Sequence, residues 1–308
     1  MNYRKLGNTE LIVSEIGLGT YAVSGVYGRK NPEDIKKVIL KAFELGITYI
    51  DTAPVYGDAE KLLGELLKGT RDKIVLSTKF SLIGVNDENI ENYITSSLQN
   101  SLKNLETDYI DLYQTHWPDP QTPPSETMEA LLELKDKGYI RAIGVSNVSI
   151  DLMKEFAKFG QIDTDQENYS LIDRKIEQDL LPWCKENQVT MIAYSPLSKG
   201  LLTGKLDPKR KFTKDDIRVF SGDKRFLGKN IENTNNLLKQ YLLPVAQKHN
   251  ATIGNIAVSY LIQNEMVVAL CGARNSIQAA ENALAGDIIL DDEDKKMVEL
   301  FIRNYKET

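Results

Sequence analysis

The sequence has 308 residues, of which 42% are hydrophobic and 27% are charged, and its formal net charge is −6 at pH 7. This composition is ordinary for a folded protein and excludes general disorder, and 38 basic against 44 acidic residues leave no nucleic-acid-binding footprint. Two cysteines and two histidines exclude a disulfide framework and a four-cysteine zinc site.

The chain shows no targeting or membrane segment. Residues 1–7 lack the apolar core of a signal peptide. The densest apolar run, 266–273, is far shorter than the ~18 residues that a spanning helix needs. We therefore expect a cytoplasmic protein without a membrane partner.

The elements predicted in chain order begin with a small hairpin, formed by 3–6 and 11–13 on either side of Gly7-Asn8. We expect it to close the amino-terminal end of the fold. Eight short apolar, β-branched runs follow, which is typical of buried parallel strands. The runs are 16–19, 49–50, 74–76, 109–113, 140–145, 164–166, 190–194 and 267–270.

Helical patterns lie between these runs. In the first, Asn31 is a predicted cap, Pro32 takes the first helical position, and Gly46 ends the helix. Similar apolar stripes occupy 90–105 and 128–138. Further helices are predicted at 237–249, 252–263 and, at the carboxyl end, 291–305.

The spacing of these elements predicts the fold class. Strand starts at 49, 74, 109, 140, 164 and 190 lie 24 to 35 residues apart, so each unit is one strand and one helix. Eight such units predict an α/β fold, a (β/α)8 TIM barrel with an N-terminal β-hairpin and an extra C-terminal helix, in a single domain over 1–308. A doubly wound open sheet is the alternative.

Four polar residues fall where barrel enzymes carry their chemistry, at the carboxyl ends of strands: Asp51, Tyr56, Lys79 and His116. Each alone has an ordinary interpretation, as a helix cap, a packing tyrosine, a solvated lysine or a core histidine. Their arrival on neighbouring strands of one rim favours a catalytic cluster.

Such a cluster suits reduction of a carbonyl group. We expect the Lys79 ammonium to lower the pKa of the Tyr56 phenol, which is near 10 in water, and Asp51 to keep that lysine charged. Tyr56 can then protonate an oxygen on which charge develops, while His116 orients it. The hydride must come from a cofactor, because no side chain supplies one.

These residues lie in segments that resemble the aldo-keto reductase superfamily. The motifs are Asp51-Thr52-Ala53-Pro54-Val55-Tyr56-Gly57, Asp111-Leu112-Tyr113-Gln114-Thr115-His116-Trp117-Pro118 and Gly144-Val145-Ser146-Asn147. The segment 193–205 is most similar to the bacterial stress-protein and inositol-operon branch, and is also similar to the potassium-channel β-subunit branch.

The resemblance implies a role for each matching position. Tyr56 would be the general acid, tuned by Lys79 and Asp51, with His116 orienting the carbonyl, and NADP(H) would be the cofactor. Ser146, Asn147 and Gln166 would hold the nicotinamide carboxamide, Tyr194 would stack on the ring, and the pyrophosphate would lie against Ser195, Leu197, Gly200 and Leu201. The adenosine half and its 2′-phosphate would meet Gly272, Ala273, Arg274, Gln278, Glu281 and Asn282.

Three further expectations concern the surroundings of this site. The gap from 190 to 267 predicts an insertion, and its polar part, 206–230, is expected to fold over the cofactor as a lid. Ser276 is a predicted cap of the helix after Arg274. The walls of a pocket for a small-molecule carbonyl substrate would come from Tyr21, Tyr27, Phe80 and Trp117.

Three functions remain open at this point. The first is a nicotinamide-dependent carbonyl reductase. The second is a cofactor-sensing binding subunit with negligible turnover, which the likeness to the channel subunits allows. The third is a barrel lyase that uses Lys79 as a Schiff-base amine. The sequence does not identify the substrate or the oligomeric state.

Overall fold

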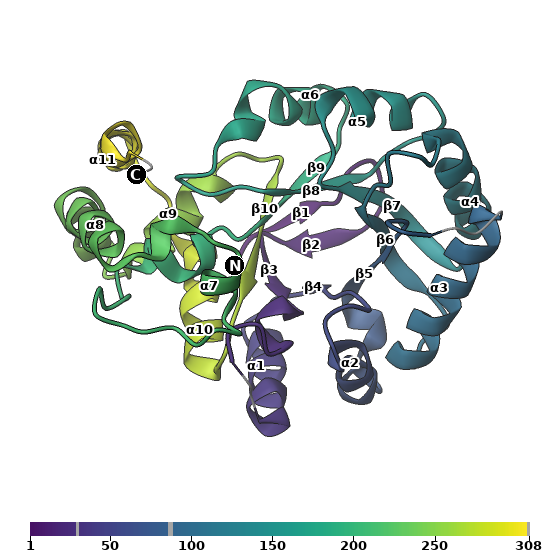
Figure 1. The fold of residues 1–308 in the computed structure, drawn as a ribbon, viewed down its shortest axis with the longest axis horizontal. Coiled ribbons are helices and arrows are strands. Elements are labelled where there is room, and N and C mark those ends of the chain that lie inside the picture. Colours follow the sequence, from purple (N-terminus) through teal and green to yellow (C-terminus); the bar gives the residue numbers. More distant parts are fainter. Residues whose placement is uncertain (29–30, 86–88, 307–308) are drawn as a thin grey trace.

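Eight parallel strands close into a barrel in the computed structural model, which describes residues 1–28, 31–85 and 89–306. The strands are hydrogen-bonded in the order β10-β3-β4-β5-β6-β7-β8-β9, and helices surround them (Figure 1). A closed barrel confirms the (β/α)8 prediction and excludes the open sheet.

All eight predicted strands are present. Their bounds are β3 Ile16–Gly19, β4 Tyr49–Asp51, β5 Val75–Ser81, β6 Ile110–Trp117, β7 Ile140–Ser146, β8 Thr164–Asn168, β9 Thr190–Tyr194 and β10 Val267–Gly272. β5 and β6 run further than predicted because they continue to pair past Lys79↔Gln114 as far as Ser81↔Trp117. Lys79 therefore lies inside a strand and not at its end.

The helices pack outside the strands. Their bounds are α1 Pro32–Glu44, α2 Ala59–Leu67, α3 Ile90–Leu105, α4 Pro124–Asp136, α5 Ile150–Ala157, α6 Leu180–Glu186, α7 Ile217–Phe220, α8 Gly228–Lys248, α9 Ile253–Ile262, α10 Ser276–Leu284 and α11 Asp292–Asn304. At the start of α1, the Asn31 side chain accepts a hydrogen bond from the backbone of Glu33, so the predicted cap is confirmed.

The helix expected at 237–249 begins earlier, at Gly228. The polar stretch at its start is helical because it buries one apolar side chain, Ile231, against Leu201, Leu206 and Phe226. A helix whose first turns carry only one buried apolar side chain has too weak an apolar stripe to be found from periodicity.

The hairpin is formed by β1 Tyr3–Lys5 and β2 Ile12–Ser14, which pair antiparallel. Leu6 and Val13 are fully buried against Tyr49, Leu112 and other apolar side chains. The hairpin thus fills the amino-terminal end of the barrel with apolar groups, as predicted.

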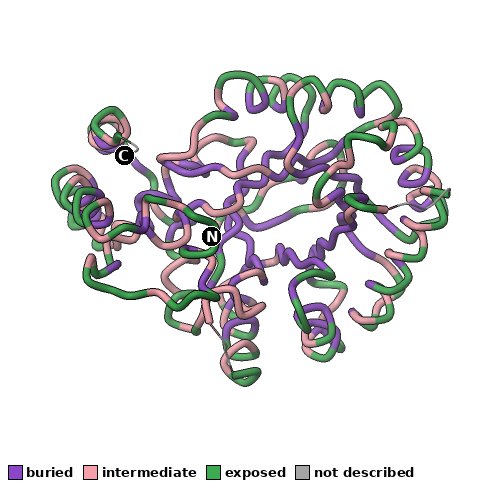
Figure 2. The backbone as a smooth tube through the Cα atoms, viewed as in Figure 1, coloured by how far each residue is buried: buried purple, intermediate pink, exposed green. Residues whose placement is uncertain are grey.

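Burial follows the two-layer architecture. The barrel strands are largely buried, whereas the helices expose their outer faces (Figure 2). The largest apolar cluster lies between strands and helices. Among residues 1–28, 31–85 and 89–306, no helix is long and apolar enough to cross a membrane.

Candidate active site

A cavity of about 810 Å³ opens at the carboxyl ends of the strands. Of the residues predicted for the site, all but four line it. The exceptions are Lys79, Phe80, Leu201 and Ala273, which are 3% exposed or less. Most residues predicted from the strand ends and most of those predicted from the family motifs therefore line the same cavity.

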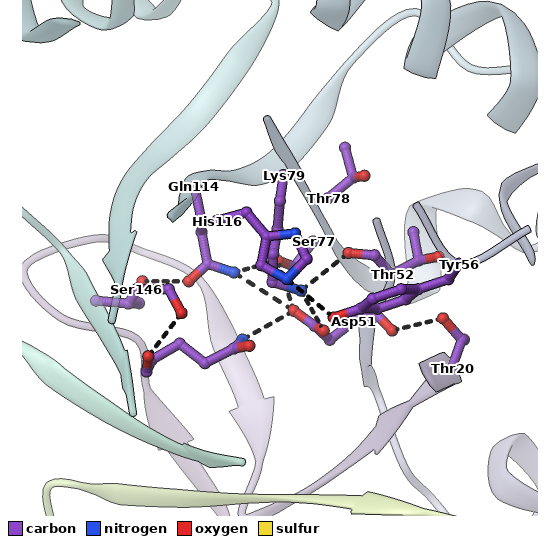
Figure 3. A network of polar contacts seen from close by, with 12 residues as sticks. Thr20, Asp51, Thr52, Tyr56, Ser77, Thr78, Lys79, Gln114, His116 and Ser146 are labelled. Carbon is purple, nitrogen blue, oxygen red and sulfur yellow. Dashed lines mark hydrogen bonds and ion pairs between the residues drawn. The ribbon is translucent and has the colours of Figure 1, made fainter. Parts of the chain in front are cut away.

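A polar network fills the barrel directly beneath the cavity, centred on the carboxylate of Asp51 (Figure 3). Asp51 Oδ2 accepts hydrogen bonds from Ser77 Oγ at 3.2 Å and from Gln166 Nε2 at 2.9 Å, with Gln114 Nε2 at 3.4 Å. Gly144 leaves room for this network, because a Cβ there would lie 2.7 Å from the Gln114 side chain.

Lys79 completes the network from β5. Its Nζ donates to Asp51 Oδ1 at 2.5 Å and to the Thr52 carbonyl at 3.0 Å. Burial lowers the pKa of the lysine, while the charge and the hydrogen bond of Asp51 raise it. The buried ammonium is stable because its partner is an equally buried carboxylate.

Tyr56 and His116 form the cavity floor above this ion pair. Tyr56 lies in the β4–α2 loop and is 8% exposed, and its hydroxyl is 3.3 Å from His116 Nε2. The Lys79 Nζ lies 5.3 Å from the centre of the Tyr56 ring. A substrate oxygen placed between the hydroxyl and the imidazole could meet both groups.

The pKa expected for Tyr56 is corrected by this geometry. Burial, followed by the charge of Asp51, raises the pKa of the phenol well above its usual value. We predicted a lowering by Lys79, but its ammonium is paired with Asp51, so little net positive charge faces the ring. The phenol is consequently held in its protonated form.

His116 is uncharged at neutral pH. Burial lowers the pKa of its imidazole to about 4, and the positive charge of Lys79 acts in the same direction. A neutral imidazole can donate one hydrogen bond without adding charge. The floor of the cavity therefore presents two neutral hydrogen-bonding groups.

The residues predicted to hold a nicotinamide carboxamide, Ser146, Asn147 and Gln166, lie at the end of β7 and on β8, and the predicted ring-stacking Tyr194 ends β9. Asn147 has a left-handed backbone, with φ of 59°, and its Nδ2 donates to the His116 carbonyl at 2.9 Å. The Tyr194 hydroxyl donates to Asn147 Oδ1 at 2.9 Å. Ser146 Oγ donates to the Gln166 carbonyl at 2.7 Å. These groups hold one another in place through hydrogen bonds.

The loop after β9 has an unusual backbone. Ser195, Ser198 and Lys199 have φ values of 55°, 46° and 54°, and Gly200 follows at 92°. Such left-handed runs cost energy in non-glycine residues and are typical of loops that contact ligands. The side chain of Leu201, a residue predicted to contact the pyrophosphate, points into the apolar cluster beneath the loop and is fully buried.

One end of the cavity is formed by residues of β10 and α10. The Gln278 side chain accepts from the Arg274 backbone at 2.8 Å, and Asn282 Nδ2 donates to the Gly272 carbonyl at 3.1 Å. The cap of α10 is Asn275 and not Ser276, because the Asn275 side chain accepts the Gln278 N–H. Ala273 lies in the core behind this wall.

Two arginines at this end were not predicted as site residues. Arg210 and Arg218 line the cavity near Arg274 and come from the segment 206–230. That segment also contacts the β3–α1 loop, since the Ile217 N–H donates to the Val26 carbonyl at 3.0 Å. The basic composition of 206–230 was the available signal, but it did not show which arginines face inward.

The predicted substrate residues behave unequally. Tyr21, Tyr27 and Trp117 line the cavity, and the Tyr21 ring centre is 5.1 Å from that of Tyr56. The prediction for Phe80 is wrong, because Phe80 is packed on Tyr113 outside the barrel. Successive side chains of a strand alternate in direction, so an inward Lys79 requires an outward Phe80.

A closed (β/α)8 barrel with an Asp–Lys pair beneath a tyrosine and a histidine defines a class, the barrel oxidoreductases that act on carbonyl groups. Comparison with known proteins identifies the family. A sequence model described as "Aldo/keto reductase family" matches residues 15–302. The chain therefore belongs to the aldo/keto reductase family.

Several relatives cover nearly the whole chain. Aldo-keto reductase YhdN of Bacillus subtilis is 36% identical, over 99% of this chain and 94% of its own. The NADH-specific methylglyoxal reductase of Escherichia coli is 34% identical, over 95% of this chain and 96% of its own.

Solved structures agree with this assignment. The glycerol dehydrogenase AKR11B4 of Gluconobacter oxydans has a TM-score of 0.88 at 31% identity, over 99% of this chain and 96% of its own. An aldo-keto reductase of Klebsiella pneumoniae, crystallised with NADPH, has a TM-score of 0.77 at 26% identity, over 100% and 98% of the two chains.

Proposed function

We propose that this chain, as a single barrel domain over residues 1–308, reduces aldehyde or ketone carbonyls with NADPH and uses Tyr56 as the general acid. One observation carries the proposal. The protonated Tyr56 hydroxyl and the neutral His116 imidazole lie 3.3 Å apart on the floor of a cavity that Arg210, Arg218 and Arg274 also line. A carbonyl oxygen and an anionic cofactor each find a complementary surface there.

The residues of the cavity fit a nicotinamide dinucleotide. Ser146, Asn147 and Gln166 would hold the carboxamide beside Tyr56, with Tyr194 against the ring. The left-handed loop from Ser195 to Gly200 would lie along the pyrophosphate. Arg274, whose buried Nε has no partner among the described residues, would meet the 2′-phosphate. When bound, NADPH supplies the hydride.

The protein groups would act on the oxygen of the substrate. His116 donates a hydrogen bond that orients the carbonyl, and Tyr56 gives its hydroxyl proton to the oxygen as the carbon accepts the hydride. The phenolate that remains is 5.3 Å, measured to its ring centre, from the Lys79 ammonium. Lys79 thus assists only once charge has formed on Tyr56.

The choice between NADPH and NADH depends on this chain's own residues, since relatives differ. The E. coli relative is named NADH-specific, whereas the K. pneumoniae structure holds NADPH. Burial and the charges of Arg218 and Arg210 lower the pKa of Arg274. Three crowded guanidinium groups favour an anion between them, and the 2′-phosphate is the anion that distinguishes NADPH.

The two other functions are less well supported. A Schiff base would need a free amine in the cavity, but Lys79 is fully buried, bonded to Asp51 and Thr52, and outside the lining. A non-catalytic cofactor sensor would use the same cavity. It would not need a protonated phenol beside a neutral imidazole.

The test is turnover by purified protein. A panel of neutral aldehydes and ketones is mixed with NADPH or NADH, and loss of the reduced cofactor is followed by its absorbance. We expect turnover with NADPH that Tyr56→Phe largely removes while NADPH still binds. Tight binding without turnover on any carbonyl would favour the sensor. Borohydride trapping of substrate on the protein, lost in Lys79→Met, would favour the lyase.

A further inference from the structure

Two acidic side chains of β8 lie on the outer face of the barrel, whereas the catalytic network lies inside it. Gln166 points inward to Asp51, so the alternation of the strand directs Asp165 and Glu167 outward. Asp165 pairs in register with Val145 and Met191, which belong to the apolar layer between strands and helices. An acidic pair in that layer is a costly arrangement and needs a reason.

Asp165 has no ordinary partner. It is fully buried, and neither of its carboxyl oxygens receives a hydrogen bond from a donor in the described part of the chain. Its side chain meets that of Glu167, and two ionised carboxylates cannot hydrogen-bond to each other. One proton between them gives one Asp165 oxygen a partner and avoids two negative charges side by side.

Glu167 in turn holds the loop that carries candidate cofactor residues. Its Oε1 accepts the Val148 N–H at 2.8 Å. Val148 follows Asn147, whose left-handed backbone places its side chain against His116, Ser146 and Tyr194. A fixed amide at Val148 therefore fixes the turn that presents Ser146 and Asn147 to the cavity.

We propose that Asp165 and Glu167 form a proton-sharing positioning pair. Asp165 keeps the proton and donates it to Glu167, and the Glu167 carboxylate holds the Val148 amide and with it the turn at Asn147. The link to the cofactor rests on the proposed nicotinamide site, whereas the proton sharing and the grip on Val148 do not.

The electrostatic surroundings agree with this division of roles. Burial, followed by the charge of Glu167, raises the pKa of Asp165 well above its usual range. Burial raises the pKa of Glu167 to about 7, while the N–H of Val148 and the charge of Lys175 act the other way. The other titratable groups that face the pair are Cys184 of α6 and Tyr194 of β9. Burial raises the pKa of the Cys184 thiol and of the Tyr194 phenol, so both stay neutral.

Proton sharing is tested by stability. A carboxyl whose folded pKa lies above its unfolded pKa of about 4 stabilises the fold at low pH and loses that contribution as pH rises. We expect the ratio of the unfolding equilibrium constants, wild type over Asp165→Asn, to rise about tenfold per pH unit between about pH 5 and 8. Parallel stability profiles for the two proteins would overturn the shared proton.

Positioning is tested with NADH, which lacks the titrating 2′-phosphate. We expect wild-type affinity to fall roughly fivefold from pH 8 to pH 6 as Glu167 takes up a proton, about 1 kcal/mol. Glu167→Leu should bind NADH weakly at both pH values. Glu167→Gln keeps a neutral acceptor for Val148, as the protonated acid does, so at both pH values it should bind NADH about as wild type does at pH 6. Glu155→Gln, on the exposed face of α5, is the matched control.

Two outcomes separate failure of this inference from failure of the proposed function. If wild type binds NADH and Glu167→Gln keeps the wild-type pH dependence, the positioning role is wrong. If wild type binds neither cofactor, the proposed function is wrong. In that case hydrogen exchange of the Val148 amide still tests whether Glu167 holds this amide, because Glu167→Leu must lose the protection from exchange that Glu167→Gln retains.

Discussion

Removal of Arg274 is the most direct probe of cofactor choice. Arg274 lines the cavity end beside α10, and its Nε is buried without a partner in the described part of the chain. A hydrogen bond to a charged group contributes about 1.5–3 kcal/mol net, or roughly 10- to 100-fold in affinity. Arg274→Ala should therefore weaken NADPH by a factor in this range and leave NADH nearly unchanged.

The neighbouring arginines lead us to expect a loss of NADPH affinity near the lower limit of this range. Arg218 donates through Nε and Nη2 to Asp216, so most of its charge is already neutralised. Arg210 has no carboxylate partner among the described residues and remains available. We expect about a 10- to 30-fold loss for Arg274→Ala and a further loss when Arg210→Ala is added.

Stability separates a binding role from a structural one. The charges of Arg218 and Arg210 lower the pKa of Arg274 after burial does, so removing Arg274 relieves repulsion. The melting temperature should not fall. Arg303→Ala, an exposed arginine of α11, is the control for loss of one positive charge.

The assay is titration of both reduced cofactors, followed by fluorescence or calorimetry. Equal losses for NADPH and NADH would refute the reasoning, because only the 2′-phosphate differs between them. A lower melting temperature together with equal losses would assign Arg274 to the fold or to the adenine.

Three other changes test the catalytic end. Tyr56→Phe should lower kcat by about 10²–10⁴-fold with little change in cofactor affinity, and steady-state kinetics with a cofactor titration would contradict the tyrosine acid if more than half of kcat remained. Lys79→Met should lower the rate of reduction at neutral pH and cost about 3–5 kcal/mol of stability, because Asp51 is left buried without its cation. Asp51→Asn should have the same effects more weakly. An unchanged pH–rate profile in these variants would contradict the coupling of Lys79 and Asp51 to Tyr56. The lowered pKa of His116 means that the unfolded chain takes up a proton between about pH 6.5 and 4 while the folded one does not, so stability should fall across that window by up to about 3 kcal/mol relative to His116→Gln, as denaturant titrations would measure.

The fold was predictable because its signals are repeated. Most of the strands are short apolar runs, with β8 as a polar exception, and the strand starts from 49 to 190 lie 24 to 35 residues apart, so an error at one boundary does not change the architecture. The ends of β5 and β6 were not predictable from hydrophobicity, since Lys79 and Gln114 are polar residues paired inside the sheet. Their burial depends on Asp51, which is distant in sequence.

That the catalytic residues lie close together was predictable from the sequence, but the pKa of Tyr56 was not. The rule that catalytic groups gather at the carboxyl ends of barrel strands brought Asp51, Tyr56 and His116 together correctly. It did not show that Lys79, once paired with Asp51, leaves the pKa of the Tyr56 phenol raised. The pKa of Tyr56 depends on that pairing, which is set by atoms on three strands.

The two ends of the cavity differ in charge, and this difference limits what the site selects. At the catalytic end, Lys79 is cancelled by Asp51, His116 is neutral and Tyr56 is protonated. The rest of the lining carries five basic side chains: Lys199, Lys205, Arg210, Arg218 and Arg274. Three of them, Lys199, Lys205 and Arg218, are paired with carboxylates. Net positive charge is therefore offered to the cofactor and not to the substrate. A carbonyl compound enters a neutral floor beside Tyr21 and Trp117, where apolar contact and two hydrogen bonds must orient it without help from an ion pair.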